Sequence, residues 1–307
     1  MKHFFLRQLF LTTLAAWGCT SASADMIDEV RAAHNKAFTA GMLEEKLEIV
    51  VSSFAENGRV MPEYQETGLG KEQISQYYEA FFERFDTKKF IKTTDEVLNL
   101  GHLIVEIGSF QTDLIVTETS EEKSLTGTYF DVWETQEDGS TKLFSSAWNY
   151  DAAFDGIRSL MHFSDIESTP AQRIPGITVS DELSYEVSAL SEFNDVLMKR
   201  QQPETLMWIY AEDAAYAPHD APIVKGRDAI AAFLKNYTSY WVPFDFVDVS
   251  VDRLDKTQWG AISYTSYNLR WIGGDQTGVA TGKGIRIWKR SKDGQLQSYR
   301  QIAMHDF

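Results

Sequence analysis

Residues 282–306 of the chain read GKGIRIWKRSKDGQLQSYRQIAMHD, and residues 127–151 read GTYFDVWETQEDGSTKLFSSAWNYD. In each stretch a Trp precedes an Asp-Gly pair by five residues, and an Asp follows that Gly by twelve. An Asp-Gly pair is typical of a tight hairpin turn of type I′, in which both central residues need positive φ. The two stretches therefore predict the closing hairpin of one domain type, present in two copies 155 residues apart (282 minus 127).

The residues before the first hairpin change their hydrophobic period once. Over residues 26–54 apolar side chains recur at three- and four-residue steps, interrupted around Gly41, which predicts two amphipathic helices with a break. From residue 90 to 150 the period is two, which predicts four strands in an antiparallel meander. Between them a third helix is predicted from Lys71. We interpret its aromatic stripe as a core face and assign no cofactor to it: Ile74, Tyr77, Tyr78, Phe81 and Phe85.

The second half repeats the order of these elements. Residues 210–213 (YAED) stand where 54–57 (FAEN) stood, 156 positions earlier, and residues 226–230 (GRDAI) repeat 70–74 (GKEQI) at the same offset. A long helix is predicted over residues 181–200, and four strands follow the repeated helix. Because few positions are identical, the ordered spacing of the elements carries the prediction of a repeat.

The amino-terminal residues have the pattern of a secretory signal peptide. Lys2 and Arg7 precede an apolar run, and small residues follow as far as Ala24. We expect residues 1–24 to be removed and the protein to be periplasmic or secreted; a lipid anchor at Cys19 is the alternative. The apolar run is shorter than the roughly 20 residues of a membrane-spanning helix, so no membrane association is expected after cleavage.

The length and composition after cleavage suit two domains. The remaining 283 residues (307 minus 24) fit a prior of about 150 residues per domain. We expect a first domain at 25–164, a linker at 165–180, where two Pro and a Gly break regular structure, and a second domain at 181–307.

The charge of the chain limits its partners. It has 29 Lys and Arg against 45 Asp and Glu, and without Lys2 and Arg7 the net charge changes from -16 to -18 (27 minus 45). Such a surface repels nucleic acid and anionic lipid, so neither is expected as a partner. The six His residues lack zinc-site spacing and the single Cys has no second Cys, so no metal site is expected.

A resemblance to a known family follows from these motifs. The order of elements, with YAEDAAYAPHDAPIVKGRDAIAAFL (210–234), EIGSF (106–110), TYFDVW (128–133) and the WNYD and MHD endings, resembles the nuclear transport factor 2-like superfamily. Its SnoaL-like and ketosteroid isomerase-like branch is the most similar. The resemblance implies two tandem cone-shaped α+β domains, each a curved antiparallel sheet packed on about three helices around a pocket. Family members often pair as dimers, which implies an internal pseudo-dimer.

Three residues of the first half are candidates for general acid–base chemistry. Asp131 shares a strand face with Tyr129 and Trp133, and burial among aromatic rings would raise the pKa of its carboxyl group. Glu106 lies among apolar residues and would need a partner or a proton. With Tyr64 they make up a Tyr and two acids, the set that ketosteroid isomerase uses. The alternative for Asp131 is a solvent-facing carboxylate or the partner of an Arg.

The second half has different residues at the equivalent positions. Arg286 stands at the place of Asp131 and is a candidate to hold a carboxylate or phosphate of a ligand, with a surface cation as the alternative. Ile262 is expected at the position equivalent to Glu106, and Tyr264 is expected beside it in the second pocket.

Histidines complete the second pocket in this interpretation. His219, in the loop after the short strand, and His305, on the final strand, are expected to line it, with surface positions as the alternative. Tyr150 replaces His305 in the first half, and Trp148 is expected on the floor of the first pocket with Tyr129.

Together these observations predict a protein that binds a small, partly apolar molecule. Isomerase, cyclase or dehydratase chemistry in the first pocket would rest on Asp131, Glu106 and Tyr64. The alternative is a non-catalytic binding or assembly module whose second copy serves as a built-in dimer partner.

Overall fold

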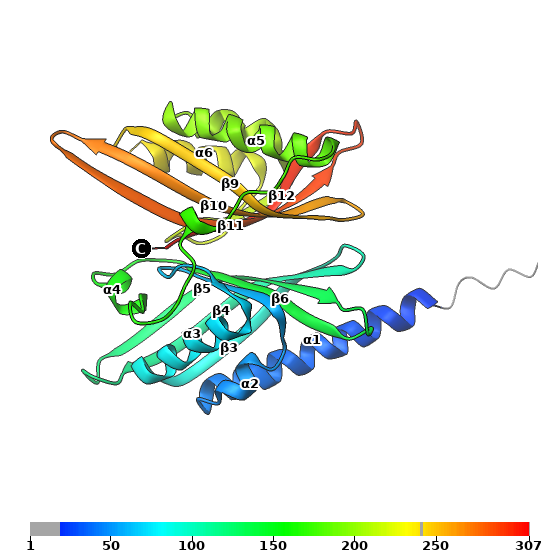
Figure 1. Ribbon diagram of the computed structural model, residues 1–307, viewed down its shortest axis with the longest axis vertical. Helices are drawn as coiled ribbons and strands as arrows, with labels where there is room; N and C mark the ends of the chain where they lie inside the picture. Colours follow the sequence, from blue (N-terminus) through cyan, green and yellow to red (C-terminus); the bar gives the residue numbers. More distant parts are fainter. Residues whose placement is uncertain (1–18, 240–241, 307) are drawn as a thin grey trace, which may run out of the picture.

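The computed structural model describes residues 19–239 and 242–306, which form two halves of the same design (Figure 1). The first half contains α1 (Cys19–Leu43), α2 (Leu47–Val51), β1 (Phe54–Pro62), β2 (Gly68–Leu69), α3 (Gly70–Arg84), β3 (Phe85–Asn99), β4 (Leu103–Val116), β5 (Glu122–Thr135), β6 (Thr141–Tyr150) and α4 (Ile157–Met161). After the 3-10 helix η1 (Ala171–Arg173), the second half contains α5 (Glu182–Lys199), η2 (Pro203–Ile209), β7 (Tyr210–Ala217), β8 (Val224–Lys225), α6 (Arg227–Thr238), β9 (Phe244–Lys256), β10 (Gly260–Gly273), β11 (Gln276–Arg290) and β12 (Leu296–His305).

Each half has a six-stranded sheet. The strand order is β2-β1-β6-β5-β4-β3 in the first half and β8-β7-β12-β11-β10-β9 in the second. The four long strands of each half pair antiparallel in chain order, as the predicted meander requires. However, β1 pairs with β6 in parallel and β7 with β12 in parallel, so each sheet is mixed and not wholly antiparallel as expected. With this correction, the prediction of two tandem α+β domains with helices packed on a sheet is confirmed.

The two sheets lie between the helices of the two halves. In Figure 1, α5 and α6 cover the outer side of the second sheet, and α1 to α3 cover the outer side of the first. Strand β5 is consequently buried on both faces, as strands between two layers are. Tyr129 and Trp133 pack in the core under the first half's helices, whereas Phe130 and Val132 pack in a core shared with the second half. An internal pairing of the two halves is thus part of the fold.

The predicted helices occur with small differences in their ends. The break expected near Gly41 falls between Leu43 and Leu47, and the aromatic stripe of α3 is buried. Asp181 caps α5: its Oδ1 accepts from the backbone N–H of Ser184 at 2.9 Å, and the hydroxyl of Ser184 accepts from the N–H of Asp181 at 3.0 Å. This reciprocal capping box explains why the helix begins where the sequence suggested.

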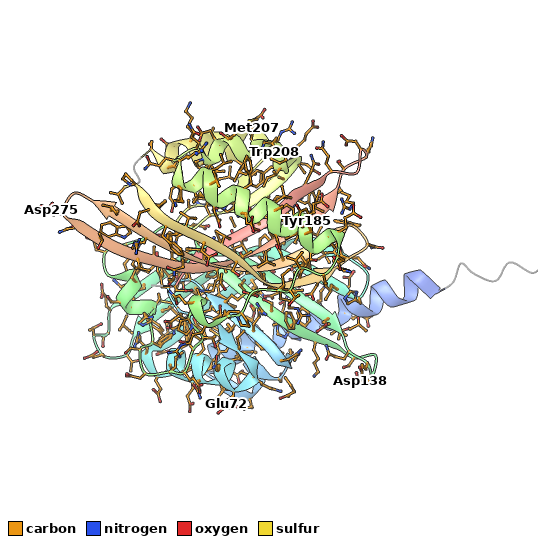
Figure 2. All side chains as sticks on the ribbon, turned by 45° about the horizontal axis from the view of Figure 1, so that its top comes forward. Glu72, Asp138, Tyr185, Met207, Trp208 and Asp275 are labelled. Atoms are coloured by element: carbon orange, nitrogen blue, oxygen red, sulfur yellow. The ribbon has the colours of Figure 1, made fainter. Side chains whose placement is uncertain are left out.

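The hairpin turns differ from the predicted type. Gly139 has a φ of 81°, but Asp138 is not among the residues with positive φ, so the type I′ prediction is wrong. The N–H of Gln136 donates to the carbonyl of Ser140, and the loop between them has three residues. A three-residue loop needs one left-handed residue, which Gly supplies, and Gly294 (φ 84°) does so in the second half. Asp138 lies at the tip of its hairpin (Figure 2).

The ends of the two halves are anchored by backbone bonds. The N–H of Thr169 donates to the carbonyl of Thr67 in the first half, and that of Ile177 to Val251 in the second, each at 2.8 Å. The boundaries 25–164, 165–180 and 181–307 stay predictions. The predicted signal peptide lies for the most part outside the described residues, which begin at Cys19. None of the described helices has the length and apolar character needed to span a membrane.

Candidate ligand cavities in the two halves

The first half encloses a small cavity between its sheet and helices. Its volume is about 60 Å³. The wall is mostly aromatic and aliphatic, with Lys92, Thr112 and Ser146 as polar members among these lining residues: Phe38, Met42, Tyr77, Tyr78, Phe81, Phe90, Lys92, Phe110, Thr112, Leu114, Tyr129, Ser146, Trp148 and Tyr150.

Glu106 is fully buried beside this cavity and accepts four hydrogen bonds. Its Oε1 accepts from the hydroxyls of Thr94 (2.6 Å) and Tyr129 (2.8 Å) and from the side-chain amide of Asn35 (2.7 Å). Its Oε2 accepts from Nη1 of Arg31 on α1 at 2.8 Å. Burial by itself would raise the pKa of Glu106, but the Lys92 charge and these donors outweigh burial and lower it. Glu106 is therefore held as a charged acceptor.

Asp131 lies directly across from Glu106 on the neighbouring strand. Its Oδ2 pairs with the ammonium of Lys92, and its Oδ1 accepts from the hydroxyl of Ser146 at 2.7 Å. The Lys92 ammonium also lies 4.0 Å from the ring centre of Tyr129. Lys92 lines the cavity and Asp131 does not, so a molecule in the cavity would meet the cation first.

The structure brings together part of the predicted acid–base set. Asp131, Glu106 and Tyr129 form one network, and Trp148 lines the cavity as expected. Tyr64 is elsewhere: its hydroxyl bonds to the carboxylate of Asp220 in the second half. The catalytic roles proposed for Asp131, Glu106 and Tyr64 stay predictions, but these three side chains do not form one cluster.

Sequence reasoning missed the basic partners of the two acids. Lys92 and Thr94 come from β3, and Arg31 and Asn35 from α1. Phe90, Lys92 and Thr94 alternate along β3, and this alternation was a signal that Lys92 and Thr94 share a face with the cavity-lining Phe90. Nothing in the sequence indicated which turn of α1 would lie over that face.

The second half encloses a larger cavity, of about 140 Å³. Four basic side chains line it, namely His219, Lys283, Arg286 and His305, and its lining residues in the described part of the chain include no Asp or Glu. The remaining wall is made of aliphatic, aromatic and neutral polar residues: Ser191, Asn194, Met198, Pro203, Leu206, Tyr210, Tyr216, Leu234, Tyr237, Val249, Thr265, Tyr267, Leu269, Gly284, Ile285, Gln301, Ile302 and Ala303.

Arg286 occupies the position equivalent to Asp131 and meets a neutral partner. Its Nε donates to Oε1 of Gln301 at 3.0 Å, and the same oxygen accepts from the hydroxyl of Tyr210 at 3.1 Å. No carboxylate among residues 19–239 and 242–306 forms an ion pair with Arg286, whereas Lys283 pairs with Asp306 at 2.7 Å. Two parallel N–H donors of a guanidinium match a carboxylate or phosphate, and Arg286 is one of the residues that line the cavity.

The rings of the two predicted histidines contact each other in the wall of this cavity. The rings of His219 and His305 are 3.8 Å apart between centres and nearly perpendicular. Nδ1 of His219 bonds to Oε1 of Glu63 at 2.7 Å, and its Nε2 lies 2.8 Å from Oδ2 of Asp220. Nδ1 of His305 bonds to the hydroxyl of Tyr267 at 2.8 Å. In the described part of the chain, no group of three or more His, Cys, Asp or Glu side chains is arranged to hold a metal ion.

One expectation for the second pocket is wrong because of strand register. Glu106 pairs with Asp131, and Ser263 pairs with Arg286, so Ser263 and not Ile262 is equivalent to Glu106. A shift of one residue turns a side chain to the other face of a sheet. Tyr264 therefore faces the first half, where its ring lies 4.6 Å from the guanidinium of Arg59 and 5.6 Å from the ring of Phe144.

Comparison with known proteins finds similarity in fold. No family model and no curated protein matches the chain. Solved structures similar to one half include a ketosteroid isomerase-like protein from Erwinia carotovora atroseptica (13% identity, 41% of this chain and 96% of that one, TM-score 0.38). A nuclear transport factor 2-like protein from Salmonella enterica is another (10% identity, 42% and 94%, TM-score 0.38).

A nuclear transport factor 2-like protein from Cytophaga hutchinsonii is also similar (14% identity, 40% of this chain and 97% of that one, TM-score 0.34). At these identities and TM-scores the likeness is one of fold and says nothing of activity. The two sheets of this chain have the same strand order, so the expected duplication of one fold is confirmed by the structure itself.

Proposed function

We propose that the second half binds a small organic anion, with the carboxylate of the ligand on Arg286 and its apolar part against the cavity wall. The observation that carries this proposal is the pairing of Arg286 with neutral Gln301 in a cavity whose lining, among the described residues, includes no acid. Arg286 is partly buried. A cation withdrawn in part from water and without a counter-charge is destabilised, and a ligand carboxylate would supply that counter-charge.

The size of the two cavities favours the second one. A cavity of about 150 Å³ accommodates benzene, and the second cavity has about 140 Å³. The first cavity, with about 60 Å³, has room for a few water molecules only. The second cavity is therefore close to the size that takes one six-membered ring, with the carboxylate of the ligand placed at Arg286.

Acid–base chemistry in the first half has weaker support. Every carboxylate oxygen of Glu106 and Asp131 already accepts a hydrogen bond or pairs with a cation, and Lys92 lines the cavity whereas Asp131 does not. We assign this network a structural role.

Export of the protein also stays a proposal, and it rests on the signal-peptide pattern of residues 1–24.

Benzoate and benzyl alcohol are matched probes of the proposal, because they share a ring and differ in charge. We expect benzoate to bind by calorimetry and to raise the melting temperature, and benzyl alcohol to do so much less. Arg286→Met should weaken benzoate binding at least about tenfold, since a hydrogen bond to a charged group contributes about 1.5–3 kcal/mol.

Arg290→Met is the control for this experiment, because Arg290 lies on the surface and pairs with Glu186. It should leave benzoate binding unchanged. Equal binding of the alcohol and the acid, or full binding by the Arg286→Met protein, would contradict the proposed function.

A further inference from the structure

Two contacts between the halves join residues that are equivalent in the repeat. Glu63 bonds to His219, and Tyr64 bonds to Asp220. Both pairs are 156 residues apart (219 minus 63, 220 minus 64), the same offset that relates residues 54–57 to 210–213. In a symmetric dimer, a residue on the two-fold axis meets its own copy. These pairs therefore lie on the local two-fold axis that relates the two halves.

The two halves differ in the residues that meet at this axis, and these residues form complementary pairs. Two identical halves would bring Glu against Glu and Tyr against Tyr, or His against His and Asp against Asp. Paired buried carboxylates disfavour one another's ionised form. The chain instead places an acid against an imidazole and a phenol against an acid, so each pair has a donor and an acceptor.

Glu63 reaches both histidines of the second cavity from the first half. It follows β1, and its side chain is fully buried. Its Oε1 accepts from Nδ1 of His219 at 2.7 Å and from the backbone N–H of His305 at 2.6 Å. The first half also supplies the carbonyl of Gln65, which accepts from the ammonium of Lys283. Three of the four basic residues that line the second cavity are thus held by the segment that follows β1.

We infer that Glu63 is a positioning residue of the second cavity, supplied by the first half at the local two-fold axis, and that anion binding in the second half depends on it. This inference rests on the proposed function. Glu63 fixes the ring of His219 and the end of β12, which line the same cavity as Arg286.

Charge supports the same conclusion. Burial by itself would lower the pKa of His219, but Glu63 and Asp220 on its two ring nitrogens outweigh burial and raise it to about 8. His219 is therefore a cation at neutral pH. The titratable and charged groups around this cluster come from both halves: Glu63, Tyr64, Arg158, Asp220, Tyr237, Tyr267, Lys283, His305 and Asp306.

Glu63→Gln in the full chain tests the inference, because it removes the charge and keeps the shape. The measurements are benzoate affinity between pH 6 and pH 9 and the titration of the His219 ring by NMR. We expect the His219 midpoint to fall, benzoate to bind about fivefold or more weakly at pH 7, and the pH profile of binding to move to lower pH.

Asp252→Asn is the matched control. Asp252 is also buried and also bonds across the two halves, to Arg59 at 2.8 Å, but it does not line the cavity. It should lower stability and leave benzoate affinity and the His219 titration unchanged. If Glu63→Gln behaves in the same way, Glu63 is an interface contact only and the inference is overturned.

A second variant covers the case in which Glu63→Gln fails to fold. His219→Gln keeps an amide donor toward Glu63 and removes the titrating group, so binding should weaken and lose its pH dependence above neutrality. Unchanged binding in that variant overturns the inference. If the unaltered protein does not bind benzoate, the proposed function fails, and the His219 titration in Glu63→Gln still decides whether Glu63 holds that ring.

Discussion

The cavities of the two halves have the same place in the fold and opposite arrangements of charge. In the first half, Glu106 and Asp131 face Arg31 and Lys92, and the charges cancel within the protein. In the second half, Arg286 takes the place of Asp131 and pairs with neutral Gln301. A few inward-facing positions therefore decide whether the charged side chains beside the cavity pair with one another or include a cation without an acidic partner among the described residues.

The parts of the repeat that have stayed alike are those that build the sheet. Trp133 and Trp288 are buried at equivalent positions, and Gly139 and Gly294 have nearly the same positive φ. The residues that have diverged include Asp131 and Arg286, on the cavity side of the sheet, and the pairs that meet at the two-fold axis. This contrast between a shared scaffold and unlike interiors leads to three predictions, in order of decreasing effect.

The charge balance of the first half should depend on Lys92. Lys92→Met leaves Asp131 buried without its cation and removes a nearby positive charge that acts on Glu106, so unfolding free energy should fall by about 3–5 kcal/mol. Lys88→Met is the control, since Lys88 and its partner Asp86 are both exposed, and it should cost about 0–1 kcal/mol. Urea denaturation measures both, and equal small losses would show that the first network is not a balanced charge cluster.

His219 and His34 should make the stability of the protein depend on pH in opposite directions. The pKa of His219 is raised from 6.5 to about 8, so its contribution is complete below about pH 6.5 and is lost as pH rises through about 8. Burial, with help from Lys92, lowers the pKa of His34 to about 3, so its contribution is lost as pH falls below about 6.5.

Denaturation at pH 5, 6.5 and 9 tests this second prediction. His219→Gln should remove an alkaline loss of stability on the order of 2 kcal/mol, because the pKa of His219 is raised from 6.5 to about 8 and one pKa unit corresponds to about 1.36 kcal/mol. His34→Phe should reduce the acid loss and leave the alkaline side as it was. An alkaline loss that persists in His219→Gln would assign it to another group.

The equivalent tryptophans should differ by one hydrogen bond. Nε1 of Trp288 donates to the hydroxyl of Ser263 at 2.9 Å, whereas Nε1 of Trp133 is buried and has no hydrogen-bond partner among the described residues. Trp288→Phe should therefore cost about 1 kcal/mol more than Trp133→Phe. Adding Ser263→Ala to Trp288→Phe should remove most of this difference in stability. Equal costs for Trp288→Phe and Trp133→Phe would contradict a stabilising role for the hydrogen bond between Trp288 and Ser263.

The candidate site was predictable where a local pattern decided it. Alternation along β5 placed Tyr129, Asp131 and Trp133 on one face. The spacing of the final hairpin placed Arg286 at the position equivalent to Asp131. Tyr264 was misplaced because the offset between the halves is 157 in β10 (263 minus 106) and 155 in β11 (286 minus 131). One residue of error in a strand reverses the face, and spacing taken from neighbouring elements does not detect it.

The partners of the charged residues lie far apart in the sequence. Arg31 is 75 residues from Glu106, and Glu63 is 156 residues from His219. The repeat offset already related Glu63 to His219, but it did not indicate that the two positions would touch. That contact depends on how the halves pack.

The amino-acid sequence by itself determined the duplication, the order of elements and the positions of the turns, because periodicity and Gly positions act over a few residues. Only the tertiary structure decided that two sheets pack against each other and bring equivalent positions to one axis. Packing of two layers depends on side chains from the whole chain at once, and so does the charge state of a buried group. For this reason the sequence identified Arg286, and only the structure showed that it lacks a counter-charge among the described residues.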